Sequence, residues 1–366
     1  MCLNPFVLDF FALARGYGMG LGCMMACLAC ILLYLKHNSD GRWLAAAYFF
    51  AMLSVFANLI FVAFYVALSG ALLYGMTGMF SRVRNKRSGV LFVKRGLVPL
   101  LTTALLLFYF VVPVRYLSAG GEFNYGASTL GGMWFEFAQD SLYGMTYAGS
   151  ATPRIAGIIA ALIVTVSVVL PLVKKSTTPE GRLGKHVAAI VALLILFFIL
   201  NHWIMGASYP AGRKSILLFP VMGLAVFAAS THLSATWHRL RQFGGMLIVV
   251  LLVAHTVHVY HPGIFREWWY DASTRDMVHY VAGEHSGSKA PTLAVEWIFH
   301  PASHFYIDTE LLPVDLKQTG KLVSPDANTD FYYIHPEHLE KLTERYTPHK
   351  NFGGRLLLQR QRSDTD

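Results

Sequence analysis

Long apolar runs, separated by short polar stretches, constrain this chain more than any other feature. An apolar run of about 20 residues is long enough to cross a bilayer as a helix. Hydrophobic residues make up 55% of the sequence and charged residues only 14%, whereas a soluble domain carries roughly 25% charged residues. The sequence therefore predicts a polytopic α-helical membrane protein of about seven or eight transmembrane helices. The expected helices are 16–35, 43–58, 59–80, 96–113, 155–173, 187–205, 215–231 and 243–260, and the pair 43–80 also fits one long tilted helix with an interfacial piece.

The charge balance divides the chain into two parts. Residues 1–260 hold 19 Lys and Arg against 6 Asp and Glu, whereas residues 261–366 hold 11 against 15. We therefore expect a transmembrane helical domain over 1–260 and a separate C-terminal domain over 261–366. Strand-like and helix-like segments alternate in the second part, which predicts a small α/β domain. The expected strands are TLAVEWIF, DFYYIHP and RLLLQRQ, and the expected helices are STRDMVHYVAGEH and HPEHLEKLTERY.

The loops predict an orientation in the membrane. Segment 82–95 has six basic residues and no acidic one, which is typical of a cytoplasmic loop. The loop 114–154 and the C-terminal domain then lie outside the cell's inner (plasma) membrane. The Met1 end falls outside as well, so we expect an odd number of helices upstream of it. The C-terminal domain has no basic patch with interleaved aromatic residues, which argues against nucleic-acid binding.

Cysteine and glycine patterns in the first apolar run favour packing over chemistry. All four cysteines lie at positions 2, 23, 27 and 30, and we expect small buried thiols there rather than a metal site. Gly16, Gly18, Gly20 and Gly22 have the spacing that lets helices approach closely.

Charged residues at the predicted outer membrane boundary are the candidate functional residues. Asp9 and Arg15 lie within an otherwise apolar stretch, and ionisable residues at membrane depth are functional hypotheses by default. Arg213 and Lys214 lie in a very short loop on the outer side, against the positive-inside bias. An anionic partner such as a phosphate explains two cations there, and contact with ordinary anionic headgroups is the alternative. Tyr209 flanks the same loop.

A metal site in the C-terminal domain is not expected. Glu296, His300 and His304 have ligand chemistry, but a spacing of four places two side chains on one face only in a helix. We predict a strand between Glu296 and His300, which separates them.

Taken in order along the chain, five segments resemble bacterial membrane glycosyltransferases of the GT-C superfamily. The likeness is to the branch related to protein mannosyltransferases and lipid A aminoarabinose transferases, and within it to Bacteroidetes-type members with a small extracytoplasmic C-terminal domain. The segments are LNPFVLDFFALARGYGMGL (3–21), EFNYGAS with QDSLYG (122–144), YPAGRKSILLFP (209–220), EWWYDASTRDM (267–277) and EWIFHPASHFY (296–306).

The resemblance implies an activity and a donor. Such enzymes transfer a sugar from a polyprenyl-phosphate-linked donor to a glycan, lipid or protein acceptor at the outer face of the membrane, and a requirement for a divalent metal is left open. Two or three helices and a loop with the catalytic acid precede the LNP-type motif in the family, so this chain by itself is expected to be incomplete and inactive. The catalytic residue is unknown, with Asp9, Glu122 and Asp140 as candidates. The expected lipid-phosphate or substrate-binding residues are Arg15, Tyr17, Tyr209, Arg213 and Lys214.

Two other interpretations remain open. A truncated, catalytically inactive paralogue would bind the lipid carrier or a partner protein without transferring sugar. A transporter or channel subunit is disfavoured, because the expected spans hold almost no charged residues and no inverted repeat is seen.

Overall fold

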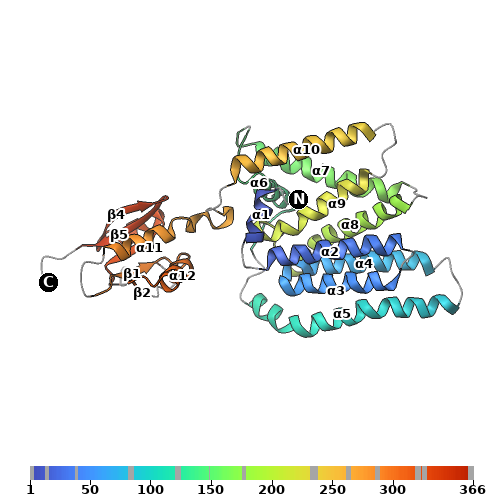
Figure 1. Ribbon diagram of the computed structural model, residues 1–366, viewed down its shortest axis with the longest axis horizontal. Helices are drawn as coiled ribbons and strands as arrows, with labels where there is room; N and C mark the ends of the chain where they lie inside the picture. The colour runs from blue at the N-terminus through green and yellow to red at the C-terminus, as the bar shows by residue number, and fades with distance from the viewer. Residues whose placement is uncertain are drawn as a thin grey trace. The chain divides into compact units, whose positions relative to one another are not determined.

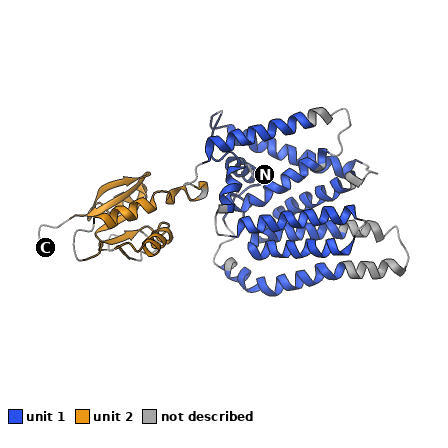
Figure 2. Ribbon diagram, viewed as in Figure 1, with its two compact units in different colours: residues 1–260 blue, residues 261–366 orange. Residues whose placement is uncertain are grey.

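The computed structural model describes residues 4–12, 16–37, 40–80, 86–119, 125–147, 149–174, 179–230, 238–260, 265–284, 289–317, 323 and 328–361. Arg15 and Glu122 lie outside the described residues. The chain divides into two compact units, residues 1–260 (unit 1) and residues 261–366 (unit 2), as Figure 2 shows.

Unit 1 is a bundle of helices that run side by side (Figure 1). Its helices are α1 (Pro5–Ala12), α2 (Tyr17–Lys36), α3 (Gly41–Ala57), α4 (Val62–Phe80), α5 (Lys86–Ala119), α6 (Leu130–Ser141), α7 (Thr152–Val173), α8 (Pro179–Met205), α9 (Leu218–Ser230) and α10 (His238–Val259), with short 3-10 helices η1 (Leu59–Phe61) and η3 (Gly212–Leu217).

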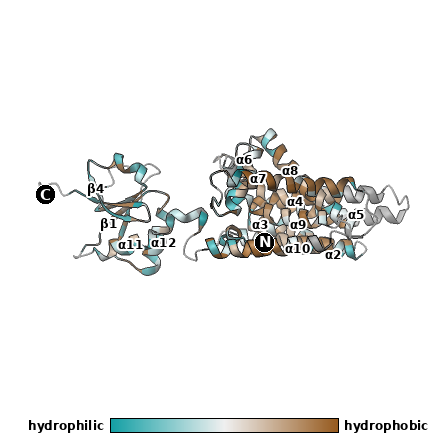
Figure 3. Ribbon diagram, turned by 90° about the horizontal axis from the view of Figure 1, so that it is seen from above, coloured by the Kyte–Doolittle hydropathy of each residue, from teal (hydrophilic) through white to brown (hydrophobic). Residues whose placement is uncertain are grey.

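Hydrophobic residues dominate the helices of unit 1 (Figure 3). Among the described residues, five helical stretches are long and apolar enough to cross a membrane, and two shorter apolar helices accompany them. This agrees with a polytopic membrane protein. The five stretches are Tyr17–Lys36, Gly96–Tyr116, Thr152–Val173, Leu183–Met205 and Gln242–Val259, and the two shorter helices are Gly41–Ala57 and Leu59–Leu73.

Glycines at the start of α2 permit close packing against the segment that joins α3 to α4. Gly16 has φ +76°, and a Cβ there would lie 2.1 Å from the Ala57 carbonyl oxygen. A Cβ at Gly20 would lie 2.4 Å from the Phe61 ring. The packing function predicted for these glycines is confirmed at both positions, whereas Gly22 faces open space. Cys27 and Cys30 are buried on the same helix.

Unit 2 is built on a five-stranded sheet with the order β2-β1-β3-β5-β4. β1 runs parallel to β2 and β3, and β5 runs antiparallel to β3 and β4. This confirms a small sheet region after the helical unit. The strands are β1 (Thr292–Val295), β2 (Asp315–Lys317), β3 (Phe331–Ile334), β4 (Tyr346–Phe352) and β5 (Arg355–Arg360), and the helices are η5 (Arg266–Asp271), α11 (Thr274–Gly283), α12 (His300–Glu310) and η7 (Pro336–Lys341).

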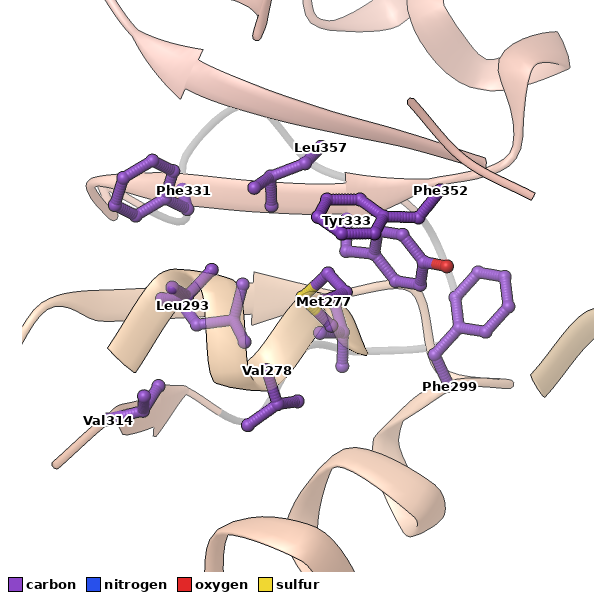
Figure 4. Close-up of a cluster of buried hydrophobic side chains, with 11 residues drawn as sticks. Met277, Val278, Leu293, Phe299, Val314, Phe331, Tyr333, Phe352 and Leu357 are labelled. Atoms are coloured by element: carbon purple, nitrogen blue, oxygen red, sulfur yellow. The ribbon is translucent and has the colours of Figure 1, made fainter. Parts of the chain in front are cut away.

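The sheet of unit 2 buries apolar side chains on both faces. On one face, Met277 and Val278 of α11 lie against Leu293 and Tyr333 of the sheet (Figure 4). On the other face, buried Tyr332, Ile334, Leu342 and Leu358 form a second cluster. Two-sided burial explains why FYYI of β3 reads as a continuous apolar run, since all four of its residues are buried.

β4 is an edge strand whose five central residues are exposed. Its pairing with β5 shifts register between Pro348 and Lys350, which marks an irregularity in the ladder. Pro348 has no N–H to offer a further strand.

Two local predictions for unit 2 are wrong, and one strand was not predicted. TLAVEWIF is a strand only as far as Val295, and α12 follows within a few residues. HPEHLEKLTERY forms the short 3-10 helix η7 rather than a full amphipathic helix. Its final residue instead begins β4, a strand that the sequence did not predict because its middle is polar and contains a proline.

Candidate functional site

Two short helices, α1 and α6, lie together at one end of unit 1 and carry two buried carboxylates. Asp9 of α1 is 5% exposed and Asp140 of α6 is 7% exposed. The Tyr143 hydroxyl donates to Asp9 Oδ2 at 2.9 Å, and Asn4 Nδ2 donates to the Ser141 carbonyl at 3.4 Å. These contacts fasten α1 to the C-terminal end of α6, and we name this region the α6 end of unit 1.

Capping residues fix the start of both short helices. Asn4 Oδ1 accepts from the Val7 N–H at 3.3 Å at the start of α1, and Thr129 Oγ1 accepts from the Gly132 N–H at 2.9 Å at the start of α6. Such caps satisfy N–H groups that have no partner within the helix. After α6, Tyr143 adopts φ +53°, so the chain turns and its hydroxyl reaches back to α1.

Aromatic packing joins α1 and α6 to α9. The Phe219 ring centroid of α9 lies 4.6 Å from that of Phe137 and 5.9 Å from that of Phe6. The Phe10 ring on α1 packs edge-to-face against Tyr17, at 4.9 Å. Tyr17 is therefore a buried neighbour of α1 at the start of α2.

The turn between α8 and α9 carries Arg213 and Lys214. Its backbone pairs with segment 125–129, because Ala127 and Tyr209 exchange two N–H to carbonyl hydrogen bonds of 2.9 Å. Lys214 Nζ donates to the Tyr125 carbonyl at 2.7 Å. The Arg213 guanidinium carbon lies 5.5 Å from the Tyr125 ring centroid, and Lys214 Nζ lies 5.6 Å from it. Both cations are thus held beside one aromatic ring that is half exposed.

Tyr209 stabilises this turn, and its side chain is buried rather than exposed beside the two cations. It is 5% exposed, and its ring stacks on His202 at 4.5 Å. The His202 Nδ1 atom lies 2.8 Å from the Ala207 carbonyl oxygen, which indicates that Nδ1 donates. The bridge from α8 to residues 207–209 fixes the start of the turn.

The structure brings the predicted site residues together in two groups. Arg213, Lys214 and Tyr209 share the turn that precedes α9, and α6 contacts this turn through η3. Asp9 and Asp140 share the α1–α6 junction. A pair of cations held against an aromatic ring suits a phosphate, and a buried carboxylate suits proton transfer.

Sequence reasoning missed the partners of these residues. Tyr125 and Tyr143 both lie between α5 and α7, in the segments EFNYGAS and QDSLYG, which the sequence had marked without assigning a role to either tyrosine. Their hydrogen bonds span more than 80 residues of sequence, which no local spacing reveals.

In unit 2, Glu296 has different partners from those considered in the sequence. Glu296 Oε2 lies 3.0 Å from His335 Nδ1, and Glu296 Oε1 lies 3.5 Å from His338 Nε2. His304 instead pairs with Asp308 on α12, at 3.0 Å. No group of three or more His, Cys, Asp or Glu side chains in the described part of the chain is arranged to hold a metal ion.

Comparison with known proteins gives no match: no protein-family model, no curated protein and no solved structure is significantly similar to this chain. The class that the structure defines is a membrane protein with several apolar helices followed by a small sheet-containing unit. The resemblance to GT-C enzymes stays a prediction that rests on the motifs.

Proposed function

We propose that the chain is a GT-C-type membrane glycosyltransferase, with seven or eight transmembrane helices, that uses a polyprenyl-phosphate-linked sugar. The observation that carries the proposal is the pair Arg213 and Lys214, held beside Tyr125 at the end of unit 1 that also contains the buried carboxylates Asp9 and Asp140. Cations and carboxylates at one end of an apolar bundle are the groups that transfer from a lipid phosphate requires.

The chemistry assigns a role to each group. An acceptor hydroxyl attacks the anomeric carbon of the sugar, the bond from that carbon to the phosphate oxygen breaks, and polyprenyl phosphate leaves. A carboxylate takes the hydroxyl proton, with Asp9, Asp140 and Glu122 as candidates. The planar guanidinium of Arg213 makes two hydrogen bonds to the leaving phosphate, and Lys214 adds a point charge. Substrate binding by Arg15 and Tyr17 is part of the same proposal.

Exposed aromatic side chains support placing the α6 end at a membrane–water boundary. Tyr116 near the end of α5 and Trp203 near the end of α8 are each 81% exposed, and Tyr260 directly follows α10. Tyr and Trp are enriched at membrane interfaces. With the basic segment 82–95 in the cytoplasm, the proposal places the α6 end and unit 2 outside the plasma membrane.

Lipid-phosphate binding tests the proposal at Arg213. The purified protein in nanodiscs is titrated with undecaprenyl phosphate, and Arg213→Ala is expected to weaken binding by at least about tenfold, since hydrogen bonds to charged groups contribute about 1.5–3 kcal/mol. The affinity of Arg213→Lys is expected to lie between those of wild type and Arg213→Ala. Arg154→Ala is the matched control, because Arg154 is an exposed arginine in the first turn of α7. Equal affinities for wild type and Arg213→Ala would remove Arg213 from the site.

Sugar transfer tests whether this chain carries its own catalytic base. Wild type, Asp9→Asn and Asp140→Asn are incubated with a polyprenyl-phosphate sugar, and release of the sugar is measured. Binding with turnover that one Asn variant abolishes supports the enzyme and identifies the base. Tight lipid-phosphate binding without turnover in any form fits a protein that only binds the carrier, and it equally fits the expectation that the catalytic acid lies outside this chain.

A further inference from the structure

α10 is an apolar helix that packing alone does not hold in place. None of the residues in the stretch Gln242–Val259 is buried, although the stretch is long and apolar enough to cross a membrane. Apolar side chains gain little by leaving lipid for a protein surface, so packing and interhelical hydrogen bonds must fix such a helix. α10 has such hydrogen bonds at its C-terminal end.

His255 of α10 contacts two groups in the outer loop. Its Nε2 atom lies 3.2 Å from the Ser141 carbonyl oxygen, and its Nδ1 atom lies 2.5 Å from the Tyr147 hydroxyl oxygen. A carbonyl oxygen only accepts, so Nε2 carries the hydrogen. In the neutral imidazole Nδ1 then accepts, and the Tyr147 hydroxyl donates. Both ring nitrogens of His255 are satisfied by these two contacts.

The Ser141 carbonyl belongs to the candidate site. Ser141 is the last residue of α6, and carbonyl groups at this end of a helix have no partner within the helix. Asn4 Nδ2 of the α1 segment donates to the same oxygen at 3.4 Å. The Ser141 carbonyl therefore joins α10, α6 and the start of α1. Ser141 directly follows Asp140 and lies two residues before Tyr143, whose hydroxyl bonds Asp9.

We propose that His255 is a positioning residue, which fastens α10 to the α6 end through Ser141 and Tyr147 and thereby fixes the α1–α6 junction that carries Asp9 and Asp140. The inference rests on the proposed function only where lipid-phosphate binding is the readout. The contact itself is tested separately, by amide hydrogen exchange.

The variants separate the two hydrogen bonds of His255. His255→Ala removes both, Tyr147→Phe removes the hydroxyl alone, and His255→Gln keeps a donor near the position of Nε2. His258→Ala is the matched control, because His258 lies on the same helix with its ring centroid 6.2 Å from that of Tyr147. All forms are reconstituted as full-length protein in nanodiscs.

Hydrogen exchange of residues 138–147 and binding of undecaprenyl phosphate are measured on each form. Interhelical hydrogen bonds in membranes contribute about 0.6–2 kcal/mol, so His255→Ala is expected to speed exchange and weaken binding about three- to thirtyfold. His255→Gln is expected to recover much of both, and His258→Ala to match wild type.

Each outcome decides a separate point. Unchanged exchange in His255→Ala overturns the contact. Faster exchange with unchanged binding, while Arg213→Ala still weakens binding, overturns the positioning role. Faster exchange in His255→Ala, together with no lipid-phosphate binding by any form, supports the fastening of α10 and overturns the proposed function instead.

Discussion

At the scale of the residue, the turn that holds Arg213 and Lys214 depends on Gly126. This glycine has φ +143°, a backbone conformation that residues other than glycine rarely adopt. A Cβ at this position would lie 2.2 Å from the Tyr209 carbonyl oxygen, the same atom that accepts from the Ala127 N–H. Close approach of two backbones therefore places the two cations beside Tyr125.

Gly126→Ala is expected to break the Ala127–Tyr209 pairing and weaken lipid-phosphate binding more than tenfold. The backbone strain costs about 1–3 kcal/mol, and the clash adds to it. Thermal unfolding and lipid-phosphate titration check this. Gly131→Ala is the control, since a Cβ at Gly131 meets open space in the first turn of α6. Equal thermal stability and equal lipid-phosphate affinity of the two alanine variants would contradict the structural role of Gly126.

The hydrogen bond between Tyr143 and Asp9 gives a second prediction at this scale. Tyr143→Phe is expected to lower the free energy of unfolding by about 1–3 kcal/mol, because a buried carboxylate loses a donor. Unfolding of the purified protein in mixed micelles with increasing denaturing detergent measures the change. Tyr116→Phe, at a largely exposed tyrosine of α5, is expected to leave stability unchanged. A stability loss at Tyr116 equal to that at Tyr143 would mean that the assay reports something other than this hydrogen bond.

At the scale of the element, the apolar runs of unit 1 were good predictors and the short segments of unit 2 were poor ones. Five of the eight expected runs correspond to helices long and apolar enough to cross a membrane, since length and hydropathy alone specify such a segment. The runs 43–58 and 59–80 correspond to shorter apolar helices, and 215–231 is divided between η3 and the 13-residue α9. In unit 2, an apolar run such as TLAVEWIF fits a strand or a helix equally well. Only the tertiary fold ends β1 at Val295, which is the last residue of β1 to pair with β3.

The candidate site was predictable only in part, for a physical reason. The cations and carboxylates were visible because charge is unusual in a membrane boundary segment. Their partners Tyr125 and Tyr143 were not, because a tyrosine is common in such loops and each of these two bonds a residue that is far away in the sequence.

Asp330 connects the first residues of two parallel strands and gives a pH-dependent prediction. Its Oδ2 atom accepts from Thr292 N–H at 2.8 Å and from Thr292 Oγ1 at 2.6 Å. Partial burial raises the pKa of Asp330, but the hydrogen bonds from Thr292 together with the charges of Lys289 and Arg360 outweigh it, so the pKa lies below its ordinary value. The carboxylate therefore stabilises β1 and β3 above the ordinary carboxyl pKa, and this stabilisation is lost as the pH falls through the lowered pKa.

Asp330→Asn is expected to destabilise unit 2 by about 0.5–1 kcal/mol at pH 7, since the group is largely exposed. The difference from wild type should shrink as the pH falls below about 4. Urea unfolding of residues 261–366 at pH 3 and pH 7 measures it. Asp315→Asn is the control, because Asp315 is paired with Lys317 on the surface of β2. A deficit of the same size at both pH values would rule out this linkage.

At the scale of the whole molecule, the two units differ in what holds them together. Unit 1 exposes many apolar side chains, whereas unit 2 has apolar clusters on both faces of its sheet. The charge balance of the sequence changes at the boundary between the two units, after residue 260.

Residues 261–366 are expected to fold without unit 1. The isolated unit should be monomeric, with a cooperative thermal transition in circular dichroism, because it contains its own core. Leu293→Ala should lower its free energy of unfolding by about 2–5 kcal/mol, since Leu293 is fully buried. Lys317→Ala, on the exposed edge strand β2, is the control. A non-cooperative transition in the wild-type unit would show that its core is insufficient.

The irregular edge strand β4 bears on how copies of this protein behave together. Unit 2 is joined covalently to an apolar bundle, so neighbouring copies in a membrane meet in two dimensions, at a local concentration far above that of free solution. Exposed strand edges join readily under such crowding. The break in register between Pro348 and Lys350, together with the lysine charge, denies a second copy a continuous ladder. The same strand that escaped sequence prediction is therefore a poor template for edge-to-edge pairing between copies.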